Sequence, residues 1–207
     1  MNLRGVLENG LFALGQVLRF PVMVLLWVCV AAALFLAGGC LVEFVSRRRE
    51  RHRFDLNAWL RGGLVLGSDA ERRQRLPAVL RQFLGDVEAQ RTHGGLGDGS
   101  LEHILLVRED RVKRTLTGPR ILVKVGPSLG LLGTLIPMGS SLASLAAGDL
   151  EAMAGQMVVA FTTTIIGLAT GTLAYVVAAI RQGWVNETVH ELRYLAERVA
   201  SERPQGA

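Results

Sequence analysis

Three long runs without a charged side chain constrain this chain more strongly than any other feature of its sequence. The runs cover residues 21–42, 125–148 and 152–180. At about 1.5 Å per residue in a helix, each run can cross a hydrocarbon core of about 30 Å. Half of the 207 residues are hydrophobic and only 20% are charged, which is unusual for a water-soluble protein. The sequence therefore predicts an all-α integral membrane protein with three transmembrane helices.

These runs divide the chain into six expected segments. The first twenty residues carry leucine at three- and four-residue intervals, a spacing typical of an amphipathic helix. The polar residues gather after the first and third spans. The expected segments are an N-terminal interfacial amphipathic helix at 1–20, transmembrane helices at 21–45, 119–147 and 150–181, a cytoplasmic helical hairpin at 46–118, and a cytoplasmic C-terminal helix and tail at 182–207.

The first segment and the first span each leave an alternative open. Residues 1–20 either lie along the outer membrane interface or extend the first span into water, because Pro21 suits both a helix start and a kink. A cleaved signal peptide is the competing interpretation of the first span. However, the apolar run is longer than the usual length of about 7–15 residues, and the basic cluster follows it instead of preceding it. We therefore expect a retained helix.

Lysine and arginine are concentrated in one part of the chain, which predicts its orientation. Residues 46–120 contain 16 of the 23 Lys and Arg residues, whereas the link between the second and third spans carries only Asp149 and Glu151. Cationic loops resist translocation. We therefore expect a multi-pass protein of the bacterial inner (plasma) membrane, with its N-terminus outside and its C-terminus in the cytoplasm. This bias and attraction to the anionic lipid bilayer explain the net charge of +5, so no nucleic-acid partner is expected.

The polar segment 46–118 carries the signals of two helices. A capping-box pattern at Ser68 and Glu71 predicts a helix over 69–92. A glycine-rich stretch follows, and Ser100 is suited to cap a second helix directly after it. Together the two helices form the expected hairpin.

Two further helix boundaries are expected. Gly118 and Pro119 form a possible break between the second arm of the hairpin and the second span. After the third span no proline occurs before Pro204, so the third helix is expected to run unbroken over 150–200, a length of about 75 Å. The second arm presents one apolar side, formed by Ile104, Leu105, Val112 and Leu116.

The sequence contains no pattern of an enzyme or metal site. Its polar part is too small for an enzyme domain, and nucleophile–base, phosphate-loop and Cys/His zinc spacings are all missing. Cys29 and Cys40 are eleven positions apart on one helix, which is too far for a disulfide. We therefore expect no enzyme activity and no cofactor.

Small and hydroxyl residues mark the second and third spans. Paired glycines four residues apart, at 126 and 130 and at 167 and 171, permit helices to approach closely in lipid. A threonine in a membrane helix either bonds to the carbonyl one turn back or presents its hydroxyl to a lumen. A stripe of small or polar residues at helical spacing on the third span is able to line a narrow lumen and comprises Gln156, Ala160, Thr164, Gly167, Gly171, Ala174 and Ala178.

Two short motifs resemble the MotA/TolQ/ExbB proton-channel family. They are Gly-Leu-Leu-Gly-Thr at 130–134 and Ala-Phe-Thr-Thr-Thr-Ile-Ile-Gly-Leu at 160–168, and the three-span layout is similar to the ExbB/TolQ branch. The resemblance implies a homo-oligomer, a pentamer, whose second and third helices surround a dimeric single-span ExbD/TolR-like partner with a membrane aspartate. It also implies that Thr134 and Thr164 face that aspartate. The candidate ion-pathway residues are Thr134, Thr163, Thr164, Ala160, Gly167 and Ser141, and the candidate helix-packing residues are Gly126, Gly130, Gly133, Gly167 and Gly171.

The chain departs from the family pattern at the second motif. Many members carry an acidic residue five positions before the second threonine, where this chain has Val159. Pro137 is expected either to kink the second span and free carbonyls toward the lumen, or to be a tolerated membrane proline. Lys124 and Glu43 lie at the edges of spans, and we expect them to reach into headgroup water or to form an ion pair.

The residues agree with the resemblance on one point, the lack of a membrane carboxylate. Between 125 and 180 the only acidic residues are Asp149 and Glu151, both in the link. Hydroxyl groups relay hydrogen bonds without burying a charge. The predicted function is the channel-forming subunit of a proton-motive-force-driven motor, conducting H⁺ or Na⁺ along the interface with its partner. The alternative is a non-conducting membrane scaffold that anchors a partner.

Overall fold

The described part of the chain consists almost entirely of α helices. The computed structural model describes residues 3–50, 74, 76–94 and 98–202, and among them no strand occurs. The helices form two compact units, Met1–Cys40 with Gly118–Ala179 and Leu41–Thr117 with Ile180–Ala207, which we call the membrane unit and the polar unit. The helices are α1 (Leu3–Glu50), α4 (Ala78–Gly94), α5 (Asp98–Arg114), α6 (Thr117–Ala146) and α7 (Leu150–Ser201).

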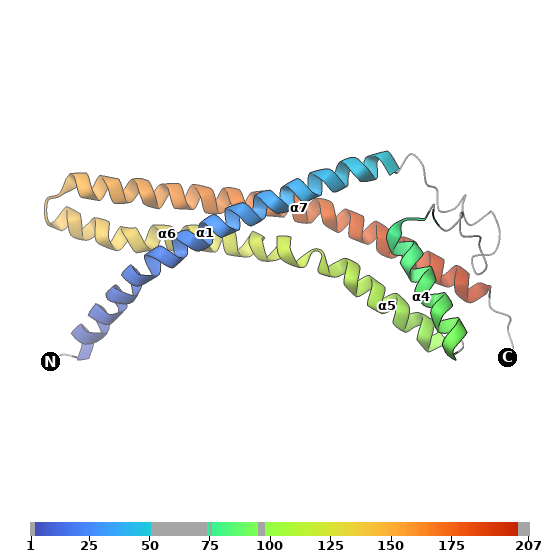
Figure 1. The fold of residues 1–207 in the computed structure, drawn as a ribbon. Helices are drawn as coiled ribbons and strands as arrows, with labels where there is room; N and C mark the ends of the chain where they lie inside the picture. Colours follow the sequence, from blue (N-terminus) through green and yellow to red (C-terminus); the bar gives the residue numbers. More distant parts are fainter. Residues whose placement is uncertain (1–2, 51–73, 75, 95–97, 203–207) are drawn as a thin grey trace. The chain divides into compact units, whose positions relative to one another are not determined.

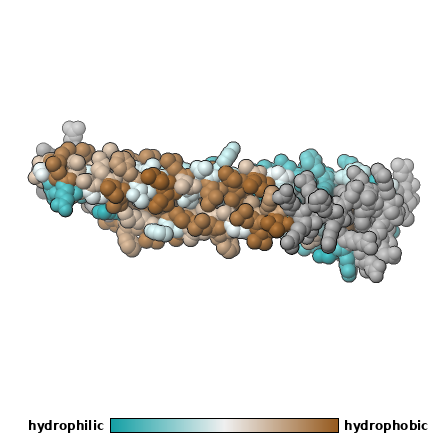
Figure 2. All heavy atoms as spheres, turned by 90° about the horizontal axis from the view of Figure 1, so that it is seen from above, coloured by the Kyte–Doolittle hydropathy of each residue, from teal (hydrophilic) through white to brown (hydrophobic). Residues whose placement is uncertain are grey.

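The three predicted spans are confirmed. Three helical stretches, Ala13–Arg47, Gly99–Ala146 and Leu150–Ser201, are long and apolar enough to cross a membrane. Large apolar side chains lie on the outside of the membrane unit, with Phe35 82% and Trp27 73% exposed, and apolar side chains cover much of the face seen in Figure 2. Such a surface is unfavourable in water but matches lipid. Within the second stretch only the part from Val125 onward is free of charge.

The first twenty residues do not form a separate helix. α1 runs from Leu3 to Glu50 with Pro21 inside it, which corresponds to the alternative in which they extend the first span. Pro21 removes one backbone donor without ending the helix, as prolines in membrane helices commonly do. The position of residues 1–20 relative to the membrane interface stays a prediction.

α6 and α7 form an antiparallel hairpin whose turn is explained by its sequence (Figure 1). Gly148 has a φ of 79°, a backbone conformation that glycine adopts without steric cost. Its N–H donates to the Leu145 carbonyl, and the Asp149 N–H donates to the Ser144 carbonyl, which together satisfy the last carbonyls of α6. The Asp149 carboxylate then accepts the Ala152 N–H at 2.9 Å and caps α7.

Two core clusters hold α1 to this hairpin within the membrane unit. Val22 and Leu26 of α1 pack with Leu129 of α6, and Ala33 packs with Leu122 and Ala174. All are under 9% exposed. The first span is therefore packed along the hairpin on one side and exposed on the other.

The polar unit has a different kind of core, built from large side chains. Phe83, Leu80 and Val87 of α4 are fully buried against the C-terminal part of α7. The predicted apolar side of α5 is confirmed, because Ile104, Leu105 and Val112 pack against buried clusters. Leu116, the fourth predicted residue, lies just after α5 and is itself buried. The α7 residues of this core are Leu192, Leu195, Ala196 and Val199.

The predicted start of the first helix in the polar unit is wrong. The helix over 69–92 is interrupted at Leu76 and Pro77, because proline disfavours the helical conformation of the residue before it. α4 begins at Ala78, and the Arg81 N–H donates to the Pro77 carbonyl. Ser68 and Glu71 lie outside the described residues.

The second helix and the break also differ from expectation. α5 begins at Asp98, so Ser100 lies inside it and is not its cap. The break between α5 and α6 falls at residues 115–116, while Gly118 and Pro119 lie in the first turn of α6, where proline needs no N–H. The prediction that α7 runs unbroken over 150–200 is confirmed by its bounds.

One buried carboxylate joins α5 to α7 in the polar unit. The Glu109 side chain is 3% exposed. It accepts hydrogen bonds from Arg193 Nε at 2.5 Å, from Arg193 Nη2 at 3.0 Å and from Lys113 Nζ at 2.9 Å. The hydrogen bond from Arg193 is the main reason that the pKa of Glu109 lies at about 2, below its ordinary 4.5. Burial works against this shift and is outweighed.

We predict that Glu109→Gln lowers the free energy of unfolding by about 1–2 kcal/mol at pH 7, because it replaces an ionised acceptor. Because the pKa of Glu109 is lower in the folded protein than in the unfolded chain, its ionised carboxylate stabilises the fold at pH values above the unfolded-state pKa. The difference between wild type and variant should therefore shrink as pH falls from 4.5 toward about 2. Urea-dependent pulse proteolysis in detergent micelles measures it.

The matched control is Asp110→Asn. Asp110 pairs with Arg114 at 2.7 Å, but both side chains are largely exposed, so the expected loss is about 0.5 kcal/mol or less. Equal losses in the two variants, or a difference unchanged down to pH 3, would contradict the role of the buried carboxylate.

Candidate functional site

The contact between α6 and α7 is a close approach of two backbones at glycine. A Cβ placed on Gly167 would lie 2.6 Å from the Gly130 Cα and 2.7 Å from the Gly126 oxygen. A Cβ on Gly171 would lie 2.6 Å from the Pro127 ring. These distances are shorter than carbon atoms tolerate, so only glycine fits.

Gly133 brings the contact to the threonine motif. A Cβ on Gly133 would lie 2.7 Å from both Cβ and Oγ1 of Thr163. One turn away, a Cβ on Gly130 would lie 3.4 Å from the Thr164 Cα. All five candidate packing glycines therefore lie in the α6–α7 contact, and the two sequence motifs meet in space.

The hydroxyl groups of the threonine motif bond to backbone carbonyls. Thr134 donates to the Leu131 carbonyl at 2.7 Å, and Thr163 donates to the Ala160 carbonyl at 2.8 Å. Thr164 differs, because its hydroxyl reaches across the contact to the Gly130 carbonyl at 3.4 Å. Each hydroxyl oxygen keeps acceptor capacity for water or a protonated carboxyl group.

The six candidate pathway residues do not occupy equivalent places. Thr134 and Thr164 are partly exposed. The other four are buried within this chain, with Ala160 4%, Thr163 6% and Ser141 1% exposed and Gly167 in the glycine contact. Ser141 donates to the Met153 carbonyl at 3.3 Å. These four are covered within the single chain, and their place in an ion pathway stays a prediction.

Thr134 and Thr164 lie close together along the helix pair. Gly130 contacts Thr164, and Thr134 follows Gly130 by four residues, about 6 Å along the helix and on the same face. A third polar residue, Gln156, belongs to the predicted stripe on α7. Its buried Oε1 has no hydrogen-bond partner among the described atoms. The hairpin thus presents two neighbouring, partly exposed hydroxyl groups, one from each of the two sequence motifs.

The residues that depart from the family pattern lie in different surroundings. Pro137 is buried within α6, and its missing N–H leaves the Gly133 carbonyl outside the helical ladder. Lys124 is exposed. Glu43 forms ion pairs in the polar unit, with Arg47 at 3.2 Å and with Arg181 at 3.9 Å. An ion pair was one of the two expectations for this residue. In the parts that the structure describes, no group of three or more potential ligand residues is placed to hold a metal.

Sequence reasoning missed two features of this region. The first is the turn at Gly148 with the cap at Asp149. A glycine followed by a capping residue indicates such a turn, but this segment was interpreted only as a link. The bond from Thr164 to Gly130 joins positions 34 residues apart. No local pattern indicates such a pair, because it depends on the register that the turn sets.

The fold and this site define a multi-pass membrane protein whose core is a glycine-packed helical hairpin carrying two threonine motifs. A model of the MotA/TolQ/ExbB proton channel family matches residues 81–194, more than half of the chain. The chain belongs to the MotA/TolQ/ExbB proton channel family.

One relative is the "Putative biopolymer transport protein ExbB homolog" of Methanothermobacter thermautotrophicus. It is 27% identical over 99 residues, which cover 47% of this chain and 36% of the relative. The match therefore spans little more than a third of that protein's length. The resemblance found in the two motifs is confirmed at the level of the family.

We predict that Gly167→Ala lowers the free energy of unfolding by about 1–3 kcal/mol, because its Cβ would overlap backbone atoms that cannot rotate away. The control, Gly155→Ala, lies on the same helix with open space around its Cβ position. It should leave stability unchanged or raise it by up to about 1 kcal/mol. Unfolding in one detergent compares both variants with wild type. Similar effects at the two positions would rule out a special packing role for Gly167.

Proposed function

We propose that this chain is the channel-forming subunit of a proton-motive-force-driven motor in the inner membrane. It conducts H⁺ or Na⁺ along its interface with a single-span ExbD/TolR-like dimer and powers mechanical work. The chain assembles as a homo-oligomer, a pentamer, with its N-terminus outside and its C-terminus in the cytoplasm. The main support is the pair Thr134 and Thr164 in charge-free membrane helices of this family.

The chemistry of the two threonines explains why a partner is needed. The spans 125–148 and 152–180 hold no carboxylate, so the group that binds and releases the ion belongs to another chain. Two hydroxyl oxygens with free acceptor capacity can hydrogen-bond a protonated aspartic acid or an ordered water. One charge crossing the membrane releases about 2.3 kcal/mol per 100 mV, which is available to move the partner helices.

The experiment replaces hydroxyl groups by methyl groups of the same shape. Thr134→Val and Thr164→Val should each reduce partner-dependent proton flux about tenfold or more, because the apolar methyl cannot bond to the carboxyl group or to water. Flux is measured with a pH-sensitive dye in proteoliposomes that contain the chain and its co-expressed partner. Thr164→Ser keeps the hydroxyl and should restore most of the flux.

Thr162→Val is the matched control. Thr162 lies on the same helix, is exposed and donates to the Val158 carbonyl at 2.8 Å, and two residues along a helix point to a different face. Its replacement should leave flux within about twofold of wild type. Undiminished flux in both Thr134→Val and Thr164→Val would refute the proposed role of these residues.

A second function, a non-conducting scaffold that anchors a partner, is favoured by one observation. The hydroxyl hydrogens of Thr134 and Thr163 are already used within their own helices, as in membrane threonines that serve packing alone. Partner binding without ion flux in the same proteoliposomes would establish this alternative.

A further inference from the structure

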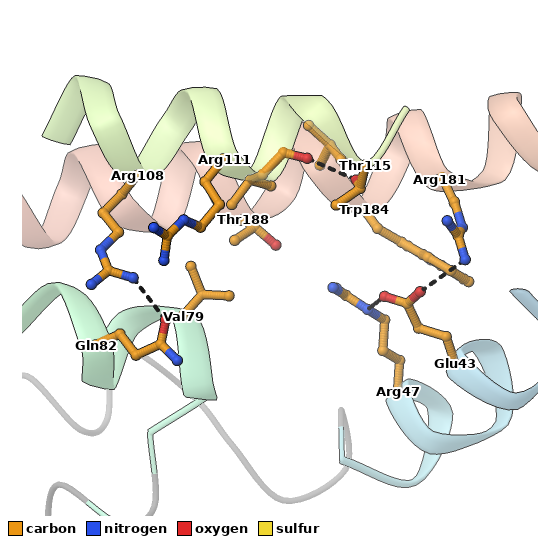
Figure 3. Close-up of a pocket in the computed structure, with 12 residues that line it drawn as sticks. Glu43, Arg47, Val79, Gln82, Arg108, Arg111, Thr115, Arg181, Trp184 and Thr188 are labelled. Carbon is orange, nitrogen blue, oxygen red and sulfur yellow. Dashed lines mark hydrogen bonds and ion pairs between the residues drawn. The ribbon is translucent and has the colours of Figure 1, made fainter. Parts of the chain in front are cut away.

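The polar unit contains a pocket of about 390 Å³ lined by arginine. Arg47 from α1, Arg108 and Arg111 from α5, and Arg181 from α7 contribute side chains to its wall. Figure 3 shows Arg108 and Arg111 on one side of the view, and Arg47, Arg181 and Trp184 on the other. This pocket is separate from the threonine motifs and plays no part in the proposed ion path.

The position of the pocket along the chain places it at lipid headgroup level. Glu43 and Arg181 are the first charged residues after the charge-free runs of α1 and α7. Trp184 follows Arg181 by three residues, or about 4.5 Å along the helix. Tryptophan is enriched at membrane–water interfaces because its ring is apolar and its N–H is polar. The headgroup layer extends about 5–8 Å beyond each side of the hydrocarbon core, so the entrance lies within reach of lipid phosphates.

The wall carries an excess of positive charge. Arg108 is neutralised by Asp86, with which it forms an ion pair. Among the described lining residues, the remaining charges are Arg47, Arg111 and Arg181 and a single carboxylate, Glu43. This leaves an excess of two positive charges in a confined space, which is unfavourable without an anion.

Two of these arginines keep unused donors. Arg181 is 18% exposed, its nearest approach to Glu43 is 3.9 Å, and its buried Nε has no hydrogen-bond partner among the described atoms. A buried donor without a partner is costly. Arg111 is exposed and makes no ion pair with any residue that the structure describes. Both guanidinium groups are therefore available to a ligand.

Arg47 is held in place to complete the wall. Its Nε donates to Glu43 at 3.2 Å, and its Cζ lies 5.2 Å from the centre of the Trp184 ring, a distance suited to a cation–π contact. The Phe44 ring stacks with the Trp184 ring, and their centres lie 6.3 Å apart. These contacts order a guanidinium group before any ligand arrives.

We propose that this pocket binds a phosphate-bearing anion, namely the headgroup of an anionic phospholipid. Guanidinium groups match phosphate oxygens in shape and charge, and Val79, Val112, Val185 and Trp184 supply apolar wall for the glycerol part. A soluble phosphate compound shares this chemistry. The lipid is favoured because the pocket begins directly where two apolar runs end.

The test is a lipid titration of the full chain in neutral detergent, with bound lipid counted by native mass spectrometry. Phosphatidylglycerol should bind more tightly than phosphatidylcholine of the same acyl chains. Arg111→Gln and Arg181→Gln should each weaken phosphatidylglycerol binding about fivefold, the effect of one basic residue near a membrane surface. The control Arg114→Gln removes the same charge three positions along α5, from a side chain that is 78% exposed and outside the pocket.

A second titration uses inorganic pyrophosphate in place of lipid. If pyrophosphate alone binds and the same two variants weaken it, the phosphate site stands and its ligand is soluble. Equal binding of the two lipids without pyrophosphate binding overturns the proposal, and so does an equal loss in all three variants. Arg111 tests the site without disturbing the fold, because its replacement breaks no ion pair among the described residues.

Discussion

The close backbone contact between α6 and α7 is the constraint on which the membrane unit depends. Lipid tails are as apolar as leucine, so burying large side chains does little to bring two membrane helices together. Dispersion between closely packed atoms has to supply the attraction, and it falls off within about 1 Å of added separation. Glycines at 126, 130, 133, 167 and 171 remove the side chains that would enforce such a separation. The Gly148 turn then fixes which glycines meet, because it sets the register of the antiparallel pair.

The buried residues of α7 differ in size between its membrane part and its polar part. In the membrane unit its buried face carries Gly167, Gly171 and Ala174, whereas in the polar unit it carries Leu192, Leu195 and Val199. Large side chains stabilise a core in water because their burial removes apolar area from solvent. Small residues stabilise a contact in lipid because they shorten it. The change in residue size along α7 therefore follows the change from lipid to water beyond Ile180.

The sequence predicted those parts of the fold that depend on composition over long windows. Three spans, the extent of α7 and the glycine pairs all follow from run lengths and helical spacing, which are local properties. The start of α4 was misplaced because the capping pattern at Ser68 was weighed without Pro77. The pair of Glu109 with Arg193 joins positions 84 residues apart, so no window of the sequence contains both. Sequence spacing placed Ala160 and Gly167 correctly on one face of α7, but it does not say whether a lumen or α6 covers that face.

Within the proposed function, the two threonines are not equivalent. Thr134 donates at 2.7 Å to a carbonyl of its own helix, so its hydroxyl hydrogen is held and its oxygen offers acceptor capacity only. Thr164 donates at 3.4 Å across the helix pair, near the limit of a hydrogen bond and correspondingly weak. Rotating its hydroxyl toward a partner's carboxylate loses little, whereas rotating that of Thr134 breaks a strong bond. Thr164 can therefore both accept from a protonated carboxyl group and donate to an ionised one, while Thr134 favours the protonated form. A wall with this asymmetry treats the two states of a titrating aspartate differently, although it carries no charge of its own.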